Sequence, residues 1–93
     1  MLLGEAATPH DLALVRRALL GDGVESVIHL RTMHLGPEEL LVAAKLEVPV
    51  AATAADVAAA IDAAEARVRA AVPIARLIYL EPDLRRAVAA SEG

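Results

Sequence analysis

Residues 26–48 decide the fold, and their sequence is SVIHLRTMHLGPEELLVAAKLEV. Both halves alternate between apolar and polar residues, which is the period-two pattern of a β-strand. The segment GPEE at 36–39 separates the halves as a turn. One side of the second half is entirely apolar: Leu40, Val42, Ala44, Leu46 and Val48. The stretch predicts an antiparallel hairpin, with strands over 26–35 and 40–48 and one face that needs a cover.

The first strand of this hairpin also divides its side chains between two faces. Alternation predicts Ile28, Leu30 and Thr32 on the covered side and His29, Arg31 and Met33 on the opposite side. The uncovered face then carries a mixture of apolar and charged groups: Arg31, Met33, Leu41, Ala43 and Lys45. Such a mixture suits a self-complementary contact with a second copy of the chain. The alternative is a sheet face that simply meets water.

Two amphipathic segments flank the hairpin. A helix over 9–20 is predicted to begin after the N-cap Thr8 and to end at Gly21. A second helix begins at the cap Thr53 and ends before Pro73. Each segment has apolar residues at spacings of three and four, so each is predicted to cover the apolar face of the sheet.

A third strand over 75–81 completes the chain, and Pro82 is predicted to stop it. A frayed helical turn is expected over 83–86. Because strand-helix-strand connections are right-handed, the third strand should lie parallel to the second. The predicted fold class is α+β, a two-layer open sandwich of ferredoxin-like α-β-β-α-β order, with a three-stranded mixed sheet and two helices on one face.

Composition narrows the function classes. The 93 residues suit one domain, and the sequence has a net charge of −4, no cysteine and Tyr79 as its single aromatic residue. Disulfides and thiol chemistry are therefore excluded, and nucleic acid is not expected as a partner because no basic stripe or stacking platform is present. No serine lies on a nucleophile elbow and no phosphate-binding motif occurs, so the chain is not expected to be an enzyme.

The three histidines, His10, His29 and His34, are not spaced as a chelating pair. Each is expected to be a solvated surface residue. His29 and His34 should point to opposite faces because they lie five residues apart on one strand. The other possibility is a metal site made with a carboxylate such as Glu81, across a dimer.

Residues 29–42, HLRTMHLGPEELLV, resemble the HDLRTRxxGP-type hairpin in the C-terminal cytoplasmic domain of cation diffusion facilitator transporters. Residues 2–6 are similar to the segment that leaves the last membrane helix of those transporters, and residues 77–82 to their closing strand. The resemblance implies a linker after a membrane segment at 1–7, a cytoplasmic α+β domain at 8–82 and a C-terminal tail at 83–93.

The resemblance also implies a role. The domain would form a homodimer and regulate an attached transmembrane domain that exchanges a divalent cation for protons, at the cytoplasmic face of the cell membrane. Compared with relatives, His29 stands in place of an aspartate, while Ile28, Ala44 and Tyr79 stand where histidines occur. If a divalent metal ion such as zinc binds, the resemblance and the residues that remain favour His29 and Glu81 as ligands, completed by water or a partner subunit.

The alternative function is a free-standing small-ligand or metal sensor with the same layered fold. The abrupt beginning at Leu2 favours the transporter, because a boundary placed after a membrane segment would look like this, with Met1 added in cloning. A minor enzyme subunit finds no support in any residue.

Overall fold

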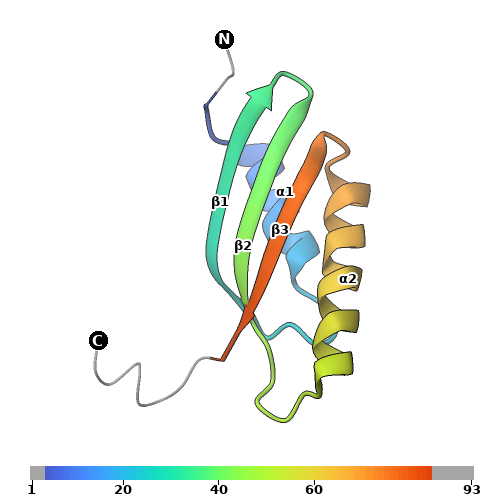
Figure 1. The fold of residues 1–93 in the computed structure, drawn as a ribbon. Coiled ribbons are helices and arrows are strands. Elements are labelled where there is room, and N and C mark those ends of the chain that lie inside the picture. Colours follow the sequence, from blue (N-terminus) through green and yellow to red (C-terminus); the bar gives the residue numbers. More distant parts are fainter. Residues whose placement is uncertain (1–3, 85–93) are drawn as a thin grey trace, which may run out of the picture.

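The computed structural model describes residues 4–84, which form two helices and three strands in the predicted order. The elements are α1 (Pro9–Leu19), β1 (Ser26–Gly36), β2 (Glu39–Glu47), α2 (Ala54–Ala71) and β3 (Ala75–Asp83). β1 pairs antiparallel with β2, and β2 pairs parallel with β3, so β2 is the central strand. Both helices lie on one face of the sheet (Figure 1). The predicted ferredoxin-like two-layer sandwich is confirmed.

Both helices begin at the threonine caps expected from the sequence. The Thr8 hydroxyl accepts a hydrogen bond from the backbone N–H of Asp11 at 3.1 Å. At α2, the Thr53 hydroxyl accepts a hydrogen bond from the Asp56 backbone N–H at 3.0 Å. The Asp56 carboxylate in turn accepts one from the Thr53 backbone N–H at 3.0 Å. This capping box satisfies two backbone donors that otherwise lack partners at the first turn.

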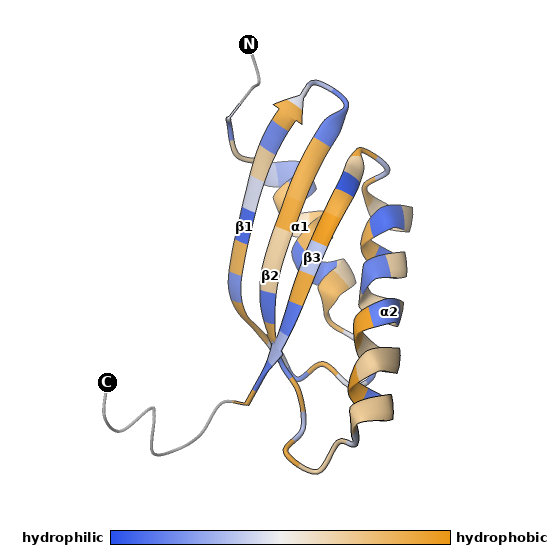
Figure 2. Ribbon diagram, in the orientation of Figure 1, coloured by the Kyte–Doolittle hydropathy of each residue, from blue (hydrophilic) through white to orange (hydrophobic). Residues whose placement is uncertain are grey.

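The core lies between β2 and the two helices. Figure 2 shows hydrophobic and hydrophilic residues alternating along β1, as a strand with one covered face requires. The side chains with no exposed surface come from both helices and the central strand: Val15, Leu19, Leu40, Val42, Leu46, Ala64 and Val68. The apolar face predicted for the second strand is therefore confirmed as the face that the helices cover.

The start of β1 departs from the predicted alternation. Val27 lies opposite Leu46 and His29 opposite Lys45, so Ile28 is an extra residue in a β-bulge. The bulge places Val27 against the core, where Ile28 was expected. From His29 to His34 the two faces are as predicted, and a second irregularity follows between His34 and Gly36 at the hairpin turn.

The end of β3 corrects a second expectation. Pro82 does not stop the strand, which continues to Asp83. The Asp83 carbonyl accepts a hydrogen bond from the Val48 N–H at 3.0 Å, so the backbone polar groups of Asp83 face β2. Backbone groups of successive strand residues point in opposite directions, so the Pro82 nitrogen faces the free edge of the sheet, where no hydrogen-bond donor is needed. The turn expected over 83–86 is thus replaced by strand at Asp83, while residues 85 and 86 lie outside the described residues.

Residues 4–7 run along the outer edge of β1. The Gly4 N–H donates to the His34 carbonyl and the His34 N–H to the Glu5 carbonyl, both at 2.7 Å. The Ala7 N–H donates to the Thr32 hydroxyl at 2.9 Å. These bonds cover backbone groups of an edge strand that would otherwise be open to pairing with another chain.

Gly23 allows the loop before β1 to pass close to α2. Its φ is +85°, and a Cβ there would lie 2.7 Å from the Ala60 Cβ. We expect Gly23→Ala to lower the free energy of unfolding by about 1–3 kcal/mol, because left-handed strain and a clash with the Ala60 side chain combine. Gly4→Ala is the matched control, since its φ of +83° is similar but no atom lies within 4 Å. Equal losses for the two variants in urea denaturation would contradict the clash.

Candidate functional site

The sheet face opposite the helices, here called the outer face, is built from three rows of side chains across β1, β2 and β3. The strand register defines the rows as His29–Lys45–Glu81, Arg31–Ala43–Tyr79 and Met33–Leu41–Leu77. The five residues predicted as an interface from the sequence therefore lie on one continuous face. His29, Arg31, Met33, Tyr79 and Glu81 are exposed, and the others are half-buried.

Leu77 and Tyr79 also belong to this face, although neither was among the five predicted interface residues. Tyr79 is 61 % exposed, whereas Ile78 and Leu80 pack toward the core. The alternation within residues 77–81 could have placed Leu77 and Tyr79 on the outer face, since it is the same period-two pattern that predicted the hairpin. This pattern does not determine the register of β3 against β2, because a helix and not a tight turn connects the two strands.

Charge and apolarity are unevenly distributed over the outer face. The row nearest the hairpin turn, Met33–Leu41–Leu77, is apolar. At the other end, the Lys45 Nζ lies 3.8 Å from the Asp83 Oδ2, and the Ser26 hydroxyl donates to the Glu47 carboxylate at 2.7 Å. The β1 side carries Arg31 and the β3 side carries acidic groups, so the face has a positive and a negative edge.

An open depression extends from the outer face past β3 to α2, where Ile61 and Glu65 also line it. Six of its lining residues belong to the two rows with charged groups: His29, Arg31, Ala43, Lys45, Tyr79 and Glu81. The small side chain of Ala43 lies between Arg31 and Tyr79 in its row, so it leaves space between them. The Arg31 guanidinium donates to the Leu30 carbonyl at 3.2 Å.

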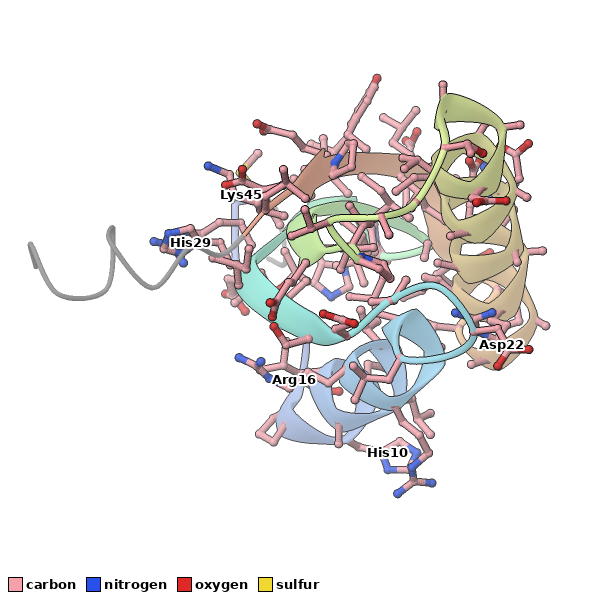
Figure 3. The ribbon with its side chains drawn as sticks, turned by 90° about the horizontal axis from the view of Figure 1, so that it is seen from below. His10, Arg16, Asp22, His29 and Lys45 are labelled. Atoms are coloured by element: carbon pink, nitrogen blue, oxygen red, sulfur yellow. The ribbon has the colours of Figure 1, made fainter. Side chains whose placement is uncertain are left out.

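The three histidines do not converge. Figure 3 shows His29 beside Lys45 at the outer face, and His10 projecting from α1 on a different side of the molecule. His34 is only 3 % exposed, so the expectation of a solvated side chain is wrong for this residue. Its ring Nδ1 lies 3.1 Å from the Gly36 carbonyl oxygen. His34 shares the covered side with Leu30, and the segment 4–7 pairs with its backbone.

The predicted metal ligands, His29 and Glu81, lie in the same row but on the two outer strands. Strands lie about 4.8 Å apart, so two strand spacings separate the two backbones by roughly 10 Å, with Lys45 between them. Within residues 4–84, no group of three or more histidine, aspartate or glutamate side chains is close enough to hold a metal ion. Zinc sites in proteins use three or four such ligands. A metal held by these two residues stays a prediction.

Solved structures supply the decisive comparison. A nickel form of a variant of the MamM C-terminal domain superposes with a TM-score of 0.78 at 19 % identity, covering 85 % of this chain and all of that one. A second MamM variant gives 0.79 at 20 % identity, covering 86 % and 100 %. A cadmium form gives 0.78 at 18 % identity with the same coverage as the second variant.

The chain has the fold of a transporter's cytoplasmic domain. MamM is a transporter of the cation diffusion facilitator family, so the resemblance first carried by the hairpin extends to the complete MamM domain. At this level of identity the likeness establishes the fold. No protein-family profile and no curated protein matches the sequence. Among residues 4–84, neither helix combines the length and the apolarity that a membrane span needs.

Proposed function

We propose that this chain is the C-terminal cytoplasmic domain of a divalent cation efflux transporter of the cation diffusion facilitator family. The observation that carries the proposal is the superposition on the MamM domain, which covers the full length of that domain. The hairpin sequence at 29–42 supports the same family independently, because its Leu-Arg-Thr and Gly-Pro groups occur at the family's spacing. In this proposal the transport itself takes place in an attached membrane domain.

We propose that the outer face binds a second copy of the chain. Met33 is 39 % exposed and Tyr79 61 % exposed, and both are large side chains that gain from burial. The positive edge at β1 and the negative edge at β3 complement each other in a symmetric pair. A two-fold axis parallel to the strands would bring β1 of one copy over β3 of the other, with Arg31 facing Tyr79 of the partner subunit.

The segment 4–7 offers a route by which such a dimer would regulate the membrane domain. If residues 1–7 form the linker from the membrane, the hydrogen bonds of residues 4–7 to His34 and Thr32 join that linker to β1. β1 also carries His29, Arg31 and Met33 of the outer face. A change in how two copies pack through β1 would therefore act directly on the linker.

The alternative is a free-standing sensor of the same fold, and the native size of the protein separates the two. We expect antibodies raised against this domain to detect a membrane-fraction protein much larger than 9.7 kDa, since bilayer-spanning helices of about 20 residues each must precede the domain. A band of about 9.7 kDa confined to the soluble fraction would contradict the transporter and favour the sensor.

A further inference from the structure

We infer that Lys45 holds the place of a metal ion on the outer face, so that the carboxylates there are neutralised by its ammonium group and two copies associate without metal. The inference rests on the proposed function, because it concerns the regulation of the same face. It follows from the position of one lysine in the strand register.

The position of Lys45 supports this inference. Lys45 is directly opposite His29 on one side and Glu81 on the other, so it occupies the middle of the row that contains both candidate metal ligands. Its Nζ lies 3.8 Å from the Asp83 Oδ2, and 34 % of the lysine side chain and 47 % of the aspartate side chain are exposed. The ammonium group is thus already directed toward the acidic edge formed by β3.

The row contains too few donor atoms for a zinc site. A zinc site made from histidine and carboxylate side chains needs three or four donor atoms at about 2.0–2.2 Å from the metal. These ligands must also be deprotonated. The row supplies one imidazole and one carboxylate, two strands apart, with a positive charge between them. A divalent cation placed between His29 and Glu81 would be repelled by Lys45 at close range. These residues do not fit a metal ion while the lysine is present.

MamM domains of this fold exist in nickel and cadmium forms, so the architecture itself is compatible with bound metal. In this chain, the row His29–Lys45–Glu81 offers two possible metal donors with a lysine between them. A constitutive positive charge at Lys45 would remove the dependence on metal, because it offsets one carboxylate charge of the face without a bound ion.

The test compares the complete chain with Lys45→His, using zinc chloride as the probe. The substitution removes the ammonium and adds an imidazole between His29 and Glu81, which gives the row three donors. We expect zinc to shift the melting temperature of the original chain by less than about 1 °C and that of Lys45→His upward by roughly 4 °C or more. Lys45→Met is the matched control, because it removes the charge without adding a donor, and its response should be smaller.

Light scattering with chelator and with zinc completes the design. A dimer of the same mass in both conditions supports the inference. A dimer that forms or tightens only with zinc overturns it, and so does a Lys45→His variant whose melting temperature zinc leaves unchanged. A monomer in every condition would instead overturn the proposed dimer, while the melting comparison, which needs no dimer, still decides the role of Lys45.

Discussion

Replacing Leu46 with alanine lowers the free energy of unfolding by about 2–5 kcal/mol, because it leaves a cavity in the centre of the core. Leu46 has no exposed surface and lies on the central strand, opposite Val27 on β1 and Pro82 on β3. Small domains have total stabilities of about 5–15 kcal/mol, so this loss is a large part of the whole. Urea denaturation at low protein concentration measures it, with the midpoint falling and the m-value unchanged.

Leu41→Ala provides the matched control, because the same three carbon atoms are removed from the same strand on the opposite face. Leu41 is half-buried on the outer face. In the monomer this variant should lose clearly less stability than Leu46→Ala, since there is less packing to lose. If the two variants lose the same amount, the helices do not cover the face that contains Leu46, and the two-layer arrangement is wrong.

Replacing Leu41 with aspartate weakens self-association at least tenfold, which corresponds to about 1.4 kcal/mol of association free energy. Leu41 is the central residue of the apolar row Met33–Leu41–Leu77. In a symmetric dimer the substitution introduces a buried carboxylate twice, near the two-fold axis, where an unpaired charge is most costly. Sedimentation velocity at several concentrations measures the change in dissociation constant.

Ala58→Asp is the control for the added charge. Ala58 is exposed on α2, and both helices lie on the face of the sheet opposite the outer face. This variant should change the net charge by the same amount and leave the association constant within a factor of about two. Should both variants weaken association equally, long-range charge and not the outer face governs it. Helix content by circular dichroism should be the same in all three proteins.

The hairpin was readable from the sequence because each residue there alternates between two environments with different polarity. Leu40, Val42 and Leu46 could face only the core once the turn at 36–39 fixed the pairing. The bulge at Ile28 was not readable, since an extra residue among apolar neighbours leaves no mark on the pattern. The prediction that Pro82 ends the third strand was wrong for a related reason. Proline ends central strands, and only the sheet order shows that β3 is an edge strand.

The candidate site was predicted as a face but not as a set of rows. Alternation alone placed Arg31, Met33 and Lys45 on one side of the sheet. The meeting of Lys45 with Asp83 depends on the parallel register set by the α2 crossover and on the continuation of β3 past Pro82. The burial of His34 followed from the same alternation, because His34 lies on the side of β1 that also carries the buried Leu30.

The central claim is that the outer face of the sheet recognises a second copy of the chain. Sedimentation equilibrium of the complete chain, without metal and over a hundredfold range of concentration, tests it most directly. The account predicts a reversible rise from 9.7 kDa to twice that mass, with Leu41→Asp remaining at the lower value. A mass of 9.7 kDa throughout, or a dimer that Leu41→Asp leaves intact, would contradict it.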